Sequence, residues 1–261
     1  MPSWEVHLGR AAQGLSDLVS RRGECLDITI TSPPYNVGLP YQGYDDDRPY
    51  GVYLGEMEAV LKALYRATVK GGRLCLNVPC GIQKGEETRP IHLDLDRRTQ
   101  EAGWQWMGTI IWQKGNRGTS CAWGSWASPS APNLLYSHEF VMVYGKGGKK
   151  LTPSGIRPDI TPEQFVRWVD SVWSISGEDP NGHPAPFPEE LVYRLLLLYS
   201  YPKSLVCDPF CGSGTTGAVA VATGRDFVGW EVSEEYVRQS RERLSVKTRL
   251  PPVMAKLERW V

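Results

Sequence analysis

The chain has 261 residues, which suits one large α/β domain with a modest insertion better than two full domains. Its 29 basic and 29 acidic residues give a formal net charge of zero. This balance excludes the overall basic field of many nucleic-acid-binding proteins, so a polyanion would have to be bound by a local patch. The longest apolar cluster, Leu195 to Leu198, is too short to span a membrane.

An early strand ends in an unusual polar and aromatic segment. Isoleucines alternate with polar residues over Leu26 to Thr31, which predicts a strand, and Ser32-Pro33-Pro34-Tyr35 follows directly. The two prolines lack N–H donors and must end the strand. A hydroxyl, free carbonyl groups and one aromatic ring remain, and together they suit the binding of a flat base. A plain Pro-Pro turn is the alternative interpretation.

Roughly the first 150 residues alternate strands with helices, which predicts an α/β fold with a mostly parallel sheet. Strands are predicted over Glu5 to Leu8, Arg73 to Val78, Gln105 to Trp112 and Phe140 to Tyr144, and helices over Tyr53 to Thr68 and Leu93 to Glu101. The acidic run Asp45 to Asp47 is expected to be a solvated loop that could belong to a lid.

Residues 113–157 are basic in an otherwise neutral chain. The basic residues are Lys114, Arg117, Lys146, Lys149, Lys150 and Arg157, against Glu139 alone. We interpret the range as the local patch that would bind a polyanion. The candidate contacts are Lys114, Arg117, Trp123, Trp126 and Lys146. An exposed basic loop over a tryptophan cluster is the alternative.

A glycine-rich turn late in the chain predicts a cofactor site. An apolar strand from Ser204 leads into Asp208 and the glycines of the Gly212 to Gly217 segment, followed by the helix-like Ala218 to Ala222. These glycines match GxGxxG, and Glu231 ends the next apolar strand, as in nicotinamide dinucleotide sites. However, Asp208 would repel a pyrophosphate and attract the ammonium or sulfonium group of S-adenosylmethionine. We therefore expect S-adenosylmethionine.

The glycine turn lies too near the end of the chain for the rest of the sheet to follow it. The upstream strands must therefore belong to the same sheet, and ligands of open α/β sheets bind at the carboxyl ends of the strands. Both the Ser32 segment and the glycine turn lie at such ends, so we expect them to face one crevice.

With both motifs, the chain resembles the DNA amino-methyltransferases of the permuted beta class. Ser32-Pro33-Pro34-Tyr35 resembles the catalytic [D/N/S]-P-P-[Y/F/W] motif, and Asp208 to Thr215 resembles the cofactor loop DPFxGSGT, in the order of that class. The segment 183–188 resembles another cofactor-side motif, and the resemblance covers about residues 5–246. Where many members carry Gly-Asp near the first strand, this chain has Gly9-Arg10.

The resemblance implies a single methyltransferase domain over 1–261, with a doubly wound, circularly permuted Rossmann-like sheet. It also implies that residues 113–157 are inserted target-recognition loops and that Trp112 to Pro132 form a wall that contacts DNA. The DNA-binding residues would be Lys114, Arg117, Trp123, Trp126 and Lys146. The catalytic residues would be Ser32, Pro33, Pro34 and Tyr35, and the cofactor-binding residues Thr31, Asp208, Pro209, Phe210, Cys211, Gly212, Ser213, Gly214, Thr215, Thr216, Glu231, His183 and Phe187.

The implied reaction is transfer of a methyl group from S-adenosyl-L-methionine to an exocyclic amine of a base flipped out of double-stranded DNA. Serine at the first motif position is typical of cytosine-N4 enzymes, whereas Asp or Asn is commoner in adenine-N6 enzymes. We therefore predict N4-methylcytosine as the product, and N6-methyladenine ranks second. Two further functions stay open: methylation of a protein glutamine or an RNA base, and a non-catalytic module that binds the cofactor or DNA.

The cysteines and the N-terminus bear on location and partners. The six cysteines show no CxxC spacing, and the N-terminus lacks a basic region followed by an apolar stretch, so we expect a cytoplasmic protein with reduced thiols and no metal site. The predicted partner is double-stranded DNA, and a cognate restriction endonuclease could accompany the protein. The oligomeric state is open between monomer and dimer.

Overall fold

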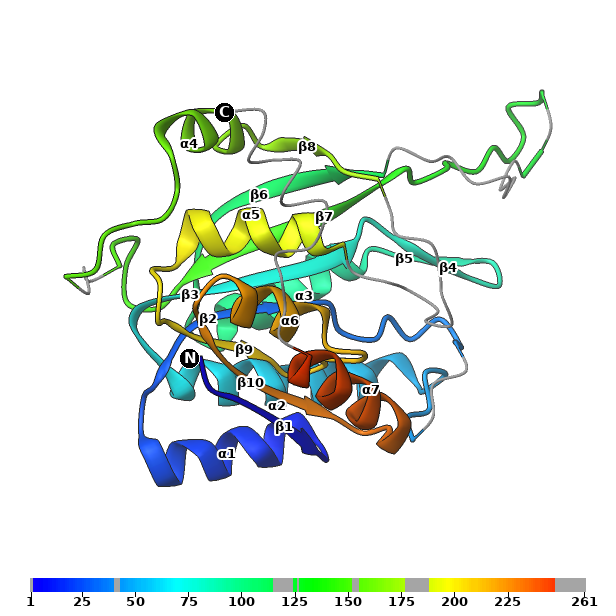
Figure 1. Cartoon of the computed structure of the whole chain (residues 1–261). Coiled ribbons are helices and arrows are strands. Elements are labelled where there is room, and N and C mark those ends of the chain that lie inside the picture. The colour runs from blue at the N-terminus through cyan, green and yellow to red at the C-terminus, as the bar shows by residue number, and fades with distance from the viewer. Residues whose placement is uncertain are drawn as a thin grey trace.

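A computed structural model describes residues 2–39, 43–114, 124–125, 127–151, 155–176 and 188–246 of the chain. Its centre is an eight-stranded sheet in the order β1-β10-β9-β2-β3-β7-β6-β8 (Figure 1). The strands are β1 (Trp4–Leu8), β2 (Leu26–Thr31), β3 (Thr68–Pro79), β6 (Gln105–Gln113), β7 (His138–Gly145), β8 (Val172–Ser174), β9 (Leu205–Asp208) and β10 (Asp226–Glu231). Strand β7 runs antiparallel to both neighbours, and the other adjacent pairs are parallel.

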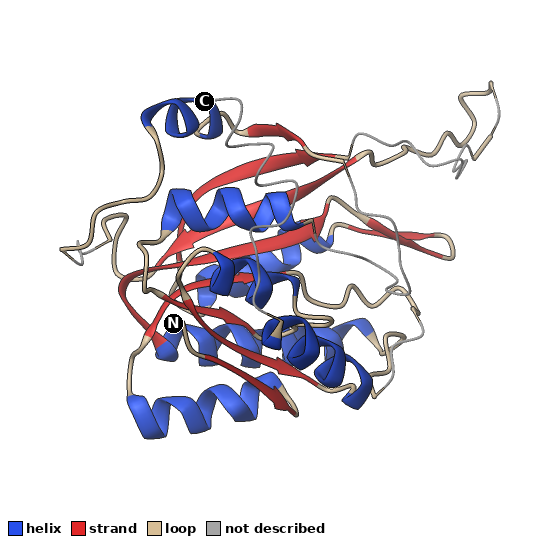
Figure 2. Ribbon diagram, viewed as in Figure 1, coloured by secondary structure: helices blue, strands red, loops and turns tan. Residues whose placement is uncertain are grey.

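Helices cover both faces of this sheet (Figure 2). The first group packs in sequence: α1 (Ala11–Arg22), α2 (Tyr50–Ala67) and α3 (Ile91–Glu101). The second consists of α4 (Pro162–Trp168), α5 (Glu189–Tyr199), α6 (Thr215–Ala222) and α7 (Glu234–Ser245). Two clusters of buried apolar side chains correspond to the two faces. The predicted mostly parallel, doubly wound fold is therefore confirmed.

Strand β2 has the bounds that the sequence predicts, but its burial differs from a one-sided strand. Thr29 and Thr31 are as buried as their neighbours Ile28 and Ile30. The reason is position: β2 lies in the middle of the sheet, between β9 and β3, with helices on both faces. The Ile and Thr side chains therefore point to opposite faces of the sheet, each covered by helices, and neither face is open to solvent.

The structure also contains elements that the sequence analysis did not predict. A short hairpin joins β4 (Ile82–Lys84) to β5 (Glu87–Arg89), with Gly85 in the left-handed region at a φ of 62°. Strand β8 adds to the edge of the sheet beside β6. Each of these three strands is only three residues long, too short for a periodic pattern to be visible.

The range 113–157 is not one inserted segment, because β7 occupies its middle. Residues of β7 pair with β3 on one side and β6 on the other. Trp112 belongs to the core rather than to a surface wall: its side chain is 3% exposed, and its indole N–H donates to the carbonyl of Ile175 at 2.9 Å. The candidate recognition segment is therefore the shorter connection between β6 and β7, residues 114–137.

Described residues 127–137 of this connection, which we call the β6–β7 arm, project beyond the ends of the two strands (Figure 1). Leu134 and Leu135 are exposed on it. Among the helices of the described ranges, none combines the length and apolar character that a membrane span requires.

Candidate active site

The carboxyl ends of β2, β9 and β10 meet at a cavity of about 250 Å³. The predicted site residues that line it are Ser32, Pro33, Pro34, Tyr35, Asp208, Pro209, Phe210, Cys211, Gly212, Ser213, Thr215, Thr216 and Glu231. Thr31 and Gly214 are buried directly behind this lining. The two sequence motifs therefore form one site, although the chain separates them by most of its length.

A hydrogen bond joins the ends of β2 and β9, the two strands that lead into the motifs. The Thr31 hydroxyl at the end of β2 donates to Asp208 Oδ1 at 2.7 Å, and the Thr216 hydroxyl donates to Asp208 Oδ2 at 2.7 Å. The Phe210 N–H also donates to Oδ1, at 3.1 Å. Burial is the main cause that raises the pKa of Asp208 to about 6, and these hydrogen bonds oppose it. Asp208 is thus a fixed, buried carboxylate beside the cavity without a cationic partner in the described residues.

The glycine turn places backbone against the neighbouring helix. Gly214 has a φ of 84°, and a Cβ there would lie 2.3 Å from Ser240 Oγ on α7. A Cβ on Gly217 would lie 2.7 Å from the Phe227 ring on β10. Glycine is therefore required at both positions, the first for its left-handed backbone and close approach, the second for close packing of α6.

Glu231 holds the same turn from the end of β10. Its Oε2 accepts the Gly212 N–H at 3.0 Å, and its Oε1 accepts the N–H groups of Val232 and Ser233 at 2.8 and 2.9 Å. Burial is the main cause that raises the pKa of Glu231. Each carboxylate oxygen has two lone pairs, so one acceptor position, on Oε2, remains for a ligand hydroxyl group.

Arg10 lies at the cavity, at the position where many of the amino-methyltransferases that the chain resembles carry aspartate. Its guanidinium is 3.5 Å from Glu56 Oε1, and Glu56 also pairs with Arg48. The sequence analysis did not single out Glu56, which lies inside helix α2 with no motif around it.

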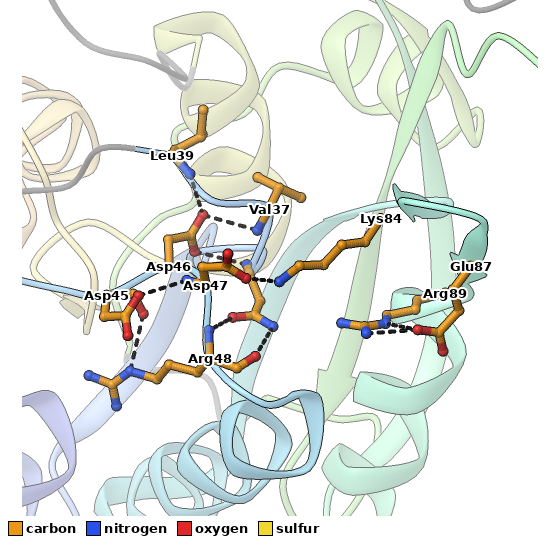
Figure 3. Close-up of polar contacts among 10 residues, drawn as sticks. Val37, Leu39, Asp45, Asp46, Asp47, Arg48, Lys84, Glu87 and Arg89 are labelled. Atoms are coloured by element: carbon orange, nitrogen blue, oxygen red, sulfur yellow. Dashed lines mark hydrogen bonds and ion pairs between the residues drawn. The ribbon is translucent and has the colours of Figure 1, made fainter.

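The acidic loop after Tyr35 differs from the predicted solvated segment. Asp46 is 2% exposed and accepts the backbone N–H groups of Asn36, Val37 and Leu39 at 2.8, 3.1 and 3.0 Å (Figure 3). The buried Asn36 side chain in turn donates to the Arg48 carbonyl and accepts the Arg48 N–H. Asp47 forms an ion pair with Lys84 on the β4–β5 hairpin. The loop is therefore fixed at its base, and its residues Gly43 and Tyr44 line the cavity.

We predict that Asp46→Ala lowers the free energy of unfolding by about 1–3 kcal/mol, because three backbone donors lose their acceptor. Urea unfolding measures this change. The matched control is Asp45→Ala, since Asp45 is exposed and should stay within about 0.5 kcal/mol of the parent. Equal effects of the two substitutions would contradict the role given to Asp46.

Two strand residues that the sequence analysis did not identify stand behind Ser32. Asn77 on β3 and Glu139 on β7 are buried and contact the Tyr35 hydroxyl. Asn77 Nδ2 donates to Glu139 Oε2 at 2.6 Å. Sequence offered no local signal for either, because strand pairing brings them to the site from distant parts of the chain.

The predicted DNA-binding residues do not all lie on one surface of the protein. Lys114 forms an ion pair with Glu139 at the root of the β6–β7 arm, and its Nζ lies 4.8 Å from the centre of the Trp112 ring. Lys146 lies at the opposite end of β7, is buried, and pairs with Glu24 at 2.8 Å, so it does not join this surface. Five predicted site residues lie outside the described residues: the DNA-binding candidates Arg117, Trp123 and Trp126, and the cofactor candidates His183 and Phe187.

Comparison with known families decides what kind of site this is. A model of the DNA methylase family that comprises N6- and N4-methyltransferases matches residues 26–242. The chain belongs to this family. These DNA methylases transfer a methyl group to the exocyclic amine of cytosine or adenine and use S-adenosyl-L-methionine, which confirms the predicted cofactor.

Individual DNA methylases are similar to the chain over much of its length. The type II methyltransferase M.MjaVI of Methanocaldococcus jannaschii is 38% identical over 156 residues, covering 59% of this chain and 79% of that protein. The DNA adenine methyltransferase YhdJ of Escherichia coli is 27% identical over 246 residues, covering 89% of this chain and 80% of YhdJ.

Solved DNA methylase structures share the fold. A putative DNA modification methylase of Thermus thermophilus, TTHA0409, solved with S-adenosyl-L-methionine, has a TM-score of 0.74 and 27% identity, over 93% of this chain and 95% of that chain. The cytosine-N4-specific PvuII DNA methyltransferase has a TM-score of 0.73 and 20% identity, over 99% and 92%, and shows the fold alone.

Proposed function

We propose that this DNA methylase transfers the methyl group of S-adenosyl-L-methionine to the N4 amine of a cytosine flipped out of duplex DNA. The observation that carries the proposal is the contact of the two motifs at one cavity, where Thr31, next to Ser32, donates to Asp208. Serine at the first motif position favours cytosine. Adenine N6 is the second candidate, because the similar YhdJ is named a DNA adenine methyltransferase.

The residues of this chain fit the cofactor. The buried Asp208 carboxylate has no cationic partner among the described side chains, and the ammonium of the cofactor's amino-acid end would supply one. The remaining acceptor position on Glu231 Oε2 suits a ribose hydroxyl group, and the loop amides with Thr215 would complete the cradle. When bound, S-adenosyl-L-methionine supplies an electrophilic methyl group on a sulfonium.

The Ser32 segment prepares the amine of the base. That nitrogen is a poor nucleophile because its lone pair is delocalised into the ring. Acceptors at Ser32 Oγ and the Pro33 carbonyl would bind the amine hydrogens, favour a tetrahedral nitrogen and align it for attack. The Tyr35 ring lines the cavity and would stack on the base, offsetting about 1–3 kcal/mol of the cost of flipping.

Transfer of labelled methyl groups from S-adenosyl-L-methionine to duplex DNA of mixed sequence, followed by nucleoside analysis, tests the proposal. N4-methylcytosine is the expected product. N6-methyladenine would overturn the choice of base and retain the amino-methyltransferase. Tight DNA binding without methyl incorporation would indicate a binding module. A role in restriction–modification, with a cognate endonuclease in the same cytoplasm, is part of the proposal and is supported by the type II relative.

The connection between β6 and β7, residues 114–137, is proposed to contact DNA through its basic residues Lys114 and Arg117. We predict that Arg117→Glu weakens DNA binding and reduces the slope of log affinity against log salt by about one unit, because one phosphate contact is lost. Affinity for S-adenosyl-L-methionine should be unchanged. The control is Arg21→Glu on the exposed side of α1. The same DNA affinity and salt slope as the parent protein would exclude Arg117 from the interface.

A further inference from the structure

Behind Ser32, four side chains form a connected polar network away from the glycine turn. They are Tyr35 from the catalytic segment, Asn77 from β3, Glu139 from β7 and Lys114 from the end of β6. None belongs to the cofactor cradle. The family motif does not explain this network, since three of its members lie outside both motifs.

Glu139 sets the direction of the hydrogen bonds in this network. Its side chain is a carboxylate paired with the Lys114 ammonium, so both oxygens only accept. Asn77 lies 2.6 Å from Glu139 Oε2, and the atom facing a carboxylate must be the amide nitrogen. The same Nδ2 lies 3.0 Å from the Tyr35 hydroxyl and therefore donates to it.

The Tyr35 hydroxyl has one proton to donate and two lone pairs that accept. It contacts Glu139 Oε2 at 3.3 Å, and a carboxylate can only accept, so the Tyr35 proton points to Glu139. Burial, followed by the nearby Glu139 charge, raises the pKa of Tyr35 well above its ordinary value, so the proton stays on the phenol. Both lone pairs then accept, one from Asn77 and one from Ser32.

The Ser32 hydroxyl lies 2.6 Å from the Tyr35 hydroxyl and, with the tyrosine proton directed to Glu139, it must donate. Asn77 Nδ2 also lies 3.4 Å from Ser32 Oγ, but its two hydrogens are directed to the nearer Glu139 and Tyr35 oxygens. The lone pairs of the Ser32 hydroxyl, which lines the cavity, therefore remain as acceptors. We infer that Glu139, acting through Tyr35, is a positioning residue that turns the Ser32 hydroxyl into an acceptor for the target amine. The inference rests on the proposed function and adds to it the group that orients the catalytic serine.

Without this network the serine proton would be free to point at the amine. A hydroxyl that donates to the amine nitrogen would occupy the lone pair that must attack the methyl group. An accepting hydroxyl instead holds an amine hydrogen and leaves the lone pair free. The effect of Glu139 should therefore appear in the chemical step and not in binding.

A double-mutant cycle on the intact enzyme tests the inference, with Glu139→Gln, Tyr35→Phe and the double variant. Tyr35→Phe keeps the ring that faces the base and removes only the hydroxyl. Each single variant should lower the single-turnover methylation rate about tenfold, the equivalent of one hydrogen bond. The double variant should be no slower than the singles, because both break one chain of hydrogen bonds. Affinities for S-adenosyl-L-methionine and for target DNA should stay within about twofold.

The control is Glu24→Gln, which removes another carboxylate paired with a lysine, at the opposite end of the sheet. Its rate should equal that of the parent. A parent rate in Glu139→Gln, or an about hundredfold loss in the double variant, would overturn the inference. If Glu139→Gln does not fold, Tyr35→Phe alone decides, and an unchanged rate would overturn it. Absence of methylation by the parent protein would instead refute the proposed function.

Discussion

Ser32→Ala should lower the single-turnover rate of methyl transfer about 100-fold, the size of effect seen when one preorganised hydrogen-bonding group of a catalytic site is removed. The acceptor for one amine hydrogen is lost, whereas the cofactor cradle around Asp208 is untouched. Affinity for S-adenosyl-L-methionine should therefore change by less than about twofold, since no cradle contact is removed. Rapid-quench methylation with saturating cofactor, together with calorimetric cofactor binding, measures the two quantities.

Ser20→Ala provides the control for this substitution. Ser20 is exposed on α1, and its hydroxyl only donates to the carbonyl of Ser16 in the same helix. The control should match the parent in rate and in cofactor affinity. A Ser32→Ala rate equal to that of the control would remove Ser32 from the mechanism, and a loss confined to cofactor affinity would assign it to binding.

Asp208→Asn should weaken the binding of S-adenosyl-L-methionine about 10- to 100-fold, because a charge-assisted contact to the ammonium is lost. The fold should persist, since the asparagine is nearly isosteric and the hydroxyl groups of Thr31 and Thr216 can rotate to donate or accept. Calorimetric titration of the cofactor measures the affinity. Asp17→Asn, at an exposed position on α1, is the control.

Asp208→Asn should weaken cofactor binding but raise the stability of the cofactor-free protein, because the pKa of Asp208 is raised. The folded pKa of about 6 lies above the ordinary value of 3.8, so the folded protein binds this proton more tightly than the unfolded chain. Without cofactor, the carboxyl therefore costs stability as the pH rises from about 4 to 6, and the cost is complete above 6. It is on the order of 3 kcal/mol.

The asparagine variant escapes this cost. In the absence of cofactor it should be more stable than the parent at pH 8, and the difference should shrink towards pH 4. Urea unfolding of both proteins across this range checks the sign. A difference that grows as the pH falls would contradict the assignment of a buried, destabilising carboxylate.

Prediction from sequence worked where a motif lies at the end of a strand. The bounds of β2 and the crevice formed by Ser32 and Asp208 follow from apolar runs that end in proline or glycine, because the backbone chemistry of these residues stops the strand locally. The confirmed fold class follows in the same way from the alternation of strands and helices.

The residues that sequence reasoning missed owe their positions to long-range pairing. Asn77 and Glu139 are single polar residues inside apolar strands, and only the antiparallel register of β3 with β7 brings them together. Asp46 looked solvated because it lies in an acidic run, yet the three backbone donors around it compensate its burial. Lys146 was assigned to DNA from charge alone, and its pairing with Glu24 depends on where β7 ends.

The pairing of β2 with β9 also has a consequence for synthesis of the protein. Thr31 and Asp208 are 177 residues apart, and a ribosome adds about 5–20 residues per second. The apolar strand β2 therefore waits on the order of 10–30 s for its neighbour to be made. During that interval the nascent chain exposes an unpaired sheet edge and has no complete site. Methylation can begin only after β9 and β10 have been translated, so chains truncated before β9 should be inactive and prone to aggregation.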